Sequence, residues 1–212
     1  MLVLEPGTGL HGKLKTARKG VGDYTVKVTG RASHAGVDFE KGRSAIVELA
    51  RQIEQISRFT ELKRGLTVNV GVIRGGTRSN VVAAEAVAEV DIRIAQIKDE
   101  KRIDRKFRSL KLFDKQCKLE VSGGLNRPPM ERSKSIVALF QQAKKIAAEL
   151  GWELQEAATG GGSDGNFTAA LGLPTLDGIG AVGEGAHANN ESVVIAELPR
   201  RTALLGALIG WV

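Results

Sequence analysis

The chain has 212 residues, of which 42% are hydrophobic and 26% are charged, a globular balance that argues against wholesale disorder. A single cysteine excludes an intrachain disulfide framework and a paired-cysteine metal site, and no apolar run approaches the roughly 18 residues of a membrane span. The net charge of +7 would suit an anionic partner if the basic residues were clustered. The N-terminal segment has no basic region before its short apolar run, so we expect no signal peptide and a cytoplasmic location.

Hydrophobic periodicity divides the first part of the chain into short strands and two helices. We expect strands at 2–4, 24–28, 68–72, 88–94 and 119–121, an amphipathic helix at 44–57 and a charged helix within 98–118. From about residue 20 to 122 the order is therefore strand, helix, strand, strand, helix, strand, which is the split βαβ or ferredoxin-like pattern. This pattern predicts an antiparallel sheet with both helices on one face.

The charged segment holds most of the basic excess. Between Lys98 and Lys118 there are nine basic residues and four acidic ones, with apolar residues spaced like one helix stripe. A solvated outer helix face and a nucleic-acid surface both fit this composition, and the solvated face is favoured. We therefore expect no nucleic-acid partner and no membrane association.

Glycine and proline pairs at 123–124 and 128–129 indicate a linker into a second portion. This portion predicts helices at 133–150, 166–171 and 196–211, strands at 153–158 and 174–176, and an irregular loop at 178–190. Alternation of helix and short strand is typical of an α/β sheet, although the strands are too few for a whole α/β domain. We thus expect an α+β unit at 15–123 and a partial α/β unit formed by 1–14 and 124–212.

Several residues could carry chemistry, and each has a simpler explanation. Glu5 ends a strand, where a carboxylate can face a site or simply be solvated. His34 and His187 lie in loops of small and polar residues, where a functional histidine and a surface histidine are equally expected. Arg93 follows Asp91 on one face of a strand and could make a surface salt bridge.

The segment 159–165, Thr-Gly-Gly-Gly-Ser-Asp-Gly, precedes a predicted helix. Successive backbone N–H groups there could cradle an anion, or Ser163 or Asp164 could simply cap the helix. No Gly-Lys-Ser/Thr sequence follows, which excludes a P-loop.

The order of these signals along the chain resembles one known family. The matching segments are Leu2–Pro6, Gly30–Gly36, Gly75–Val82 with Asp91–Arg93, Thr159–Gly165 and Ala186–Glu191. Together they are similar to the second half of the dizinc metallopeptidases that include glutamate carboxypeptidase, acetylornithine deacetylase and succinyl-diaminopimelate desuccinylase. The likeness to glutamate carboxypeptidase is the strongest, and it covers nearly the whole chain.

This resemblance implies a lid of the split βαβ type that dimerises, and therefore a homodimer. It also implies hydrolysis of the amide bond of N-acyl amino acids or of C-terminal glutamate-type peptides, with two zinc ions activating a water and a glutamate as general base. By the same resemblance, His34 would stabilise the oxyanion in the partner's site. The remaining implied residues are Glu5 and His187 for zinc, Asn80 and Arg93 for substrate orientation, and Gly161, Gly162 and Ser163 for the substrate carboxylate.

The chain also departs from the family pattern. The family needs a His-x-Asp pair, a bridging aspartate and a Glu-Glu pair, and all of them would precede Glu5, which only four residues precede here. Catalytic zinc takes about three protein ligands per ion, so Glu5 and His187 alone would bind it weakly. We therefore expect a truncated chain that is inactive by itself. The alternative is a non-catalytic dimerisation or binding module.

Overall fold

The computed structural model describes residues 1–211, and the chain forms two compact units. The first unit joins residues 1–20 to the chain from Arg127 onward, and the second unit is Val21–Asn126. The observed boundaries differ by a few residues from the expected 15 and 123. The reason is strand β2 (Leu14–Arg18), which the sequence analysis missed and which pairs with strands of the first unit.

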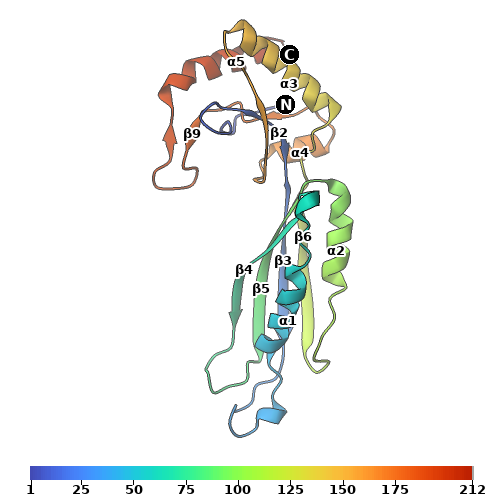
Figure 1. The fold of residues 1–212 in the computed structure, drawn as a ribbon. Helices are drawn as coiled ribbons and strands as arrows, with labels where there is room; N and C mark the ends of the chain where they lie inside the picture. Colours follow the sequence, from blue (N-terminus) through green and yellow to red (C-terminus); the bar gives the residue numbers. More distant parts are fainter. Residues whose placement is uncertain (212) are drawn as a thin grey trace. The chain divides into compact units, whose positions relative to one another are not determined.

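The second unit has the expected ferredoxin-like order. Its helices and strands are β3 (Gly20–Thr29), 3-10 helix Phe39–Lys41, α1 (Ala45–Ser57), 3-10 helix Leu62–Arg64, β4 (Thr67–Gly75), β5 (Glu85–Ile94), 3-10 helix Ile97–Asp99, α2 (Glu100–Arg108) and β6 (Lys118–Arg127). The strands form one sheet in the order β4-β5-β3-β6, in which β4 and β5 are antiparallel (Figure 1). Strand β4 is therefore an edge of this sheet.

Both helices of the second unit pack on the same face of the sheet. Alternate residues of β3 point to this face, and among them Tyr24 and Val26 are almost fully buried. The Tyr24 ring stacks on Phe107 of α2, with ring centroids 3.9 Å apart, while Leu49 and Ile56 of α1 join the same core. The predicted arrangement of sheet and helices is confirmed.

Helix α1 begins where the sequence predicts, but its buried face is narrower than expected. The Ser44 side chain caps the helix by accepting the Val47 N–H. Leu49 is buried, whereas Ile46 and Val47 are 46% and 52% exposed, although all three are apolar residues of the predicted amphipathic helix. The difference arises because Ile46 lies beside Gly75, at the end of edge strand β4, where no further strand covers it.

The charged helix is shorter than predicted, because α2 ends at Arg108. Leu112 and Phe113 follow in an irregular segment and not on a helix stripe. The buried carboxylate of Glu48 explains this, because it accepts the backbone N–H groups of Phe113 and Asp114 at 3.1 and 2.9 Å. Those N–H groups are then unavailable to a continuing helix.

The first unit is an incomplete α/β layer. It consists of β1 (Leu2–Val3), β2, α3 (Lys134–Glu149), β7 (Glu156–Thr159), α4 (Gly165–Ala170), β8 (Leu176–Asp177), β9 (Gly183–Glu184), β10 (Ser192–Val193), 3-10 helix Ile195–Glu197 and α5 (Leu198–Trp211). Its main sheet has the order β1-β8-β2-β7. The β1–β8 and β2–β7 pairs are parallel, and Leu14, Phe140 and Leu204 lie in its core.

Two further features of the first unit bear on the sequence predictions. Strands β9 and β10 form a separate antiparallel ribbon; β9 lies within the segment 178–190 that was expected to be an irregular loop, and β10 follows that segment. Across residues 1–211, every helix is too short or too polar to cross a membrane.

Candidate functional site

The glycine-rich segment 159–165 follows β7 directly and leads into α4. Ser163 is only 2% exposed, and its hydroxyl donates to the Asp177 carboxylate at 2.5 Å. The Ser163 N–H donates to the Asn166 side-chain oxygen at 3.0 Å, and the Gly165 N–H donates to the Ser163 hydroxyl at 3.2 Å. Both hydrogen-bond donors of Ser163 are therefore used within the chain.

A buried ion pair lies behind this segment. Arg18 of β2 is paired in register with Thr159 of β7, and its guanidinium contacts Asp177 of β8 through two hydrogen bonds of 2.6 and 2.9 Å. Arg18 is 5% exposed and Asp177 is fully buried. The third guanidinium nitrogen of Arg18 donates to the Gly161 carbonyl at 3.0 Å. The sequence analysis named neither partner of this pair.

The two residues expected to bind metal lie in the first unit. Glu5 follows β1 with an exposed side chain, and its carbonyl accepts the Gly180 N–H at 3.0 Å. His187 lies in the exposed turn between β9 and β10, with a φ of 68°, a backbone conformation uncommon outside glycine. Nearby, burial and then the Arg18 charge lower the pKa of Lys15, and its ammonium donates to the Pro6 carbonyl at 2.5 Å.

Among the described residues, no group of three or more histidine, cysteine, aspartate or glutamate side chains is placed to hold a metal ion. Glu5 and His187 offer the oxygen and nitrogen donors that zinc accepts, but catalytic zinc takes about three protein ligands. The described part of the chain therefore does not by itself fit a zinc centre.

His34 and Asn80 lie together in the second unit. The Ala35 N–H donates to the Asn80 carbonyl at 2.9 Å, and His34 forms an isolated β-bridge with Val81. The Gly36 N–H donates to Nδ1 of His34 at 3.1 Å, so Nδ1 is the acceptor nitrogen. In the neutral imidazole the proton is then on Nε2, and the exposed ring offers an Nε2–H donor.

Arg93 lies at the opposite end of β5 from this pair. Its guanidinium makes a bidentate contact with Asp91, with hydrogen bonds of 2.9 and 2.7 Å, and this contact raises the pKa of Arg93. Both side chains are on the sheet face opposite the buried Ile92. The surface salt bridge weighed from the sequence is present, while the Arg93 side chain is still 31% exposed.

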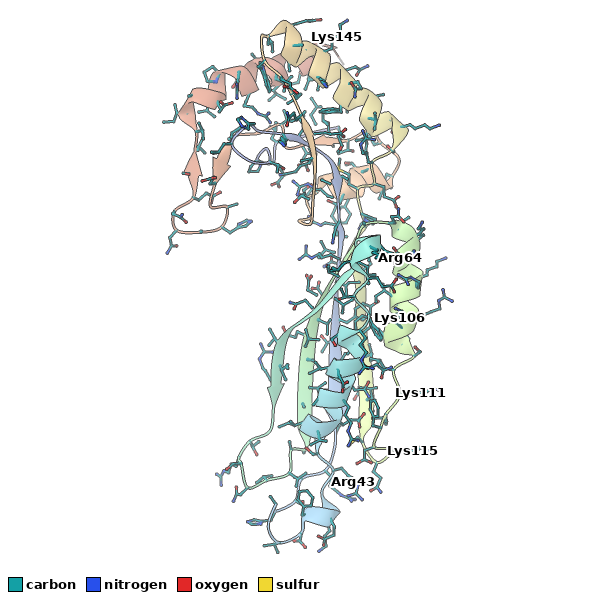
Figure 2. All side chains as sticks on the ribbon, viewed as in Figure 1. Arg43, Arg64, Lys106, Lys111, Lys115 and Lys145 are labelled. Atoms are coloured by element: carbon teal, nitrogen blue, oxygen red, sulfur yellow. The ribbon has the colours of Figure 1, made fainter. Side chains whose placement is uncertain are left out.

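Several basic residues of the second unit lie on α2 and on neighbouring segments. Figure 2 labels Lys106 on α2, Lys111 and Lys115 on the segment after it, and Arg64 at the end of the 3-10 helix Leu62–Arg64. Part of this charge is neutralised locally, because Glu61 accepts from Lys106 at 2.9 Å and Arg64 contacts the buried Asp99 at 2.6 Å. These pairs are typical of a solvated face and reduce its net positive potential.

Comparison with known proteins identifies the second unit. Residues 16–110 match the model of a peptidase dimerisation domain of the M20 family. Carboxypeptidase G2 of Pseudomonas sp. strain RS-16 is 30% identical over 99% of this chain and 51% of its own length. A Bacillus subtilis protein, the uncharacterized YqjE, is 29% identical over 86% of this chain and 49% of its own length. The chain thus spans about half the length of these curated relatives.

Solved structures extend the likeness to both units. Aminopeptidase PepT from Bacillus cereus is 25% identical, with a TM-score of 0.82 over 98% of this chain and 56% of its own. A tripeptidase from Staphylococcus aureus shares the fold, with a TM-score of 0.78 at 23% identity over 98% of this chain and 55% of its own. The dimerisation-domain match, the carboxypeptidase relative and the peptidase fold agree, and they show that this chain is similar to peptidases of the M20 family.

Proposed function

We propose that this protein acts in the hydrolysis of the amide bond of N-acyl amino acids or of peptides that end in glutamate. The relative found over nearly the whole chain is named a carboxypeptidase, which supports an amino acid with a free carboxylate as the product. The observation of the structure that supports this proposal is the hydrogen bond from the Gly36 N–H to Nδ1 of His34. That bond keeps the Nε2–H of a neutral His34 available as a donor.

In this proposal His34 donates its Nε2–H to the oxyanion that develops when the amide carbonyl is attacked. Such a donor stabilises the transition state more than the bound substrate, because the negative charge exists only in the former. Asn80, held beside His34 by the backbone bond to Ala35, orients the same end of the substrate. Within the segment Gly161–Ser163, the Gly162 N–H would receive the substrate carboxylate, because both hydrogen-bond donors of Ser163 are already used within the chain. Arg93 would orient the substrate.

Zinc is proposed as the metal that the complete site uses to activate water. Glu5 and His187 are the donors that we propose this chain contributes, and the other zinc ligands would come from outside residues 1–211. We call the protein that includes those ligands the complete protein. If so, Glu5→Gln and His187→Asn should each lower the zinc retained by the complete protein after dialysis, as measured by atomic absorption. Unchanged zinc content in both variants would remove these residues from the metal site.

We also propose a homodimer that forms at edge strand β4. Ile73 pairs in register with the buried Ala88, so it faces the helix-bearing side of the sheet, yet it is 59% exposed. Ile46 of α1 is exposed beside the end of the same strand. An unpaired strand edge with apolar neighbours favours pairing with a second copy. A non-catalytic dimerisation module would use the same edge, so this proposal holds for either function.

Ile73→Lys tests the dimer, because a charge at an apolar edge opposes strand pairing. We expect the variant to elute as a monomer with its measured mass halved in light-scattering chromatography, while Lys118→Ala at the start of β6 stays dimeric. A dimeric Ile73→Lys protein would place the interface elsewhere. The expected cytoplasmic location remains a prediction, which cell fractionation would test.

The proposed activity is tested with two matched substrates in the complete protein. An N-acyl-L-glutamate should be hydrolysed, and the N-acyl amine that lacks only the α-carboxylate should be hydrolysed far more slowly. When the substrate lacks the α-carboxylate, the protein groups that would donate hydrogen bonds to it stay unpaired. The loss of these hydrogen bonds strongly slows the hydrolysis of that substrate. Equal rates on both substrates would refute a carboxylate-directed hydrolase.

A further inference from the structure

We propose that Arg18 and Asp177 are positioning residues that hold the glycine loop, residues 159–165, with its free backbone donor turned outward. The inference rests on the proposed function, in which this loop receives the substrate carboxylate. It adds two residues that take no direct part in binding. Arg18, Asp177 and the glycine loop all belong to the first unit.

A buried ion pair is weak evidence for stability by itself. Removing both charges from water costs several kcal/mol, which the attraction between them only partly repays. Arg18 and Asp177 are both almost fully buried, and the remaining hydrogen-bonding capacity of both side chains is directed at the glycine loop. These hydrogen bonds indicate that the ion pair holds the glycine loop in place.

Arg18 determines which way the peptide groups of the loop face. Its terminal nitrogen donates to the carbonyls of Gly161 and Gly162, at 3.0 and 3.4 Å. A trans peptide places its C=O and N–H on opposite sides, so the Gly162 N–H points away from the guanidinium. Among the described residues this N–H has no hydrogen-bond acceptor, and so it is free for an anion.

Asp177 fixes the other end of the loop. One carboxylate oxygen accepts both the Arg18 Nε–H at 2.9 Å and the Ser163 hydroxyl at 2.5 Å. Ser163 in turn accepts the Gly165 N–H, and its own N–H is held by Asn166. The loop is thus attached to a rigid pair of strands at both ends, which lowers the entropy lost when a ligand binds.

The pair also sets the charge behind the loop. Asp177 neutralises Arg18, so a bound carboxylate meets a backbone donor and not an unpaired cation. A lysine at position 18 would keep the positive charge but lose the planar fork that serves Asp177 and the loop carbonyls together. Arg18→Lys therefore keeps the positive charge at position 18 and removes the hydrogen-bonding geometry of the guanidinium.

Arg201→Lys is the matched control. Arg201 is 3% exposed, belongs to the same unit, and donates to backbone carbonyls of Gly12 at 2.8 Å and Gly180 at 3.0 Å. It touches no residue of the glycine loop in the described structure. Both variants replace an almost fully buried guanidinium with an ammonium, but only Arg18 pairs with a carboxylate and donates to the glycine loop.

The first arm of the test is amide hydrogen exchange of the chain. In Arg18→Lys we expect the Ser163 and Gly165 amides, which are hydrogen-bonded within the loop, to exchange at least about tenfold faster. In Arg201→Lys they should change by less than about twofold. Unchanged exchange in Arg18→Lys overturns the positioning role. Asp177→Asn carries the same expectation and serves if Arg18→Lys does not fold.

The second arm compares kinetics on the two matched substrates in the complete protein. Arg18→Lys should raise KM for the N-acyl-L-glutamate at least about tenfold with kcat changed less than about threefold, and leave the substrate without the α-carboxylate unaffected. General loss of structure would not remove this preference selectively. Faster exchange with an unchanged preference overturns the link to the carboxylate. If neither substrate is cleaved by the unaltered protein, the proposed function fails, while the exchange arm still decides the positioning role.

Discussion

Mixing two inactive variants tests whether His34 acts in the site of its own chain or of the partner. The reason to expect the partner's site is the geometry of the second unit. His34 and Asn80 lie together before β5 begins, while Arg93 is near its end. At about 3.3 Å per residue, the eight steps along the strand from Glu85 to Arg93 span roughly 26 Å. One small substrate cannot contact both ends of this strand within a single unit.

The expected magnitudes follow from the roles of the two residues. His34→Ala removes one oxyanion donor, which typically costs about 10²–10³ in kcat. Glu5→Ala removes a proposed zinc ligand from the other unit. In a mixed dimer, the subunit that retains Glu5 would receive His34 from its partner, giving one working site of two. With free exchange half of the dimers are mixed, so activity should recover to about a quarter of the unaltered value.

The assay is hydrolysis of an N-acyl-L-glutamate by the complete protein, with native mass spectrometry to count the mixed dimers. Glu5→Ala mixed with unaltered protein provides the control for subunit exchange. If mixed dimers are abundant and activity stays at the level of the separate variants, His34 does not act across the dimer. The distance of roughly 26 Å along β5 would then not prevent His34 from acting in the site of its own chain.

Two further predictions concern the second unit. A Cβ at Gly30 would lie 2.0 Å from the Arg43 carbonyl, so Gly30→Ala should lower the free energy of unfolding by about 1–3 kcal/mol in urea titrations, whereas Gly124→Ala, with open space around it, should change it by less than about 0.5 kcal/mol. Hydrogen bonds from Arg102 and Lys106 lower the pKa of Glu61 from 4.5 to about 2, so its stabilising contribution is present above pH 4.5 and is lost as the pH falls through about 2. The stability difference between the unaltered protein and Glu61→Gln should therefore shrink between pH 5 and pH 2, and a constant difference would contradict this.

The fold of the second unit was predictable because its elements repeat regularly. The alternation of Tyr24, Val26 and Val28 fixes the buried face of β3, and α1 begins next to Ser44, where the predicted helix starts. The end of α2 was not predictable from periodicity. Beyond that end, the carboxylate of Glu48, a residue distant in sequence, accepts the backbone N–H groups of Phe113 and Asp114 and holds this segment in a non-helical conformation. A helix pattern cannot reveal such a competitor.

The candidate site also contains residues that a local sequence pattern indicates and residues that only long-range contacts reveal. Loops with unusual composition drew attention to His34 and His187, and their proposed roles stay predictions until the variants are measured. Arg18 and Asp177 gave no local signal, because an arginine at the end of a short strand and an aspartate before a glycine are common on surfaces. Their role becomes visible only in the folded sheet, where β2 pairs in parallel with β7. There the two buried charges lie beneath a loop that is more than 140 residues away from Arg18 in the sequence. A single sequence indicates which residues could bind a ligand, but the residues that hold those in place are found only when distant strands pair.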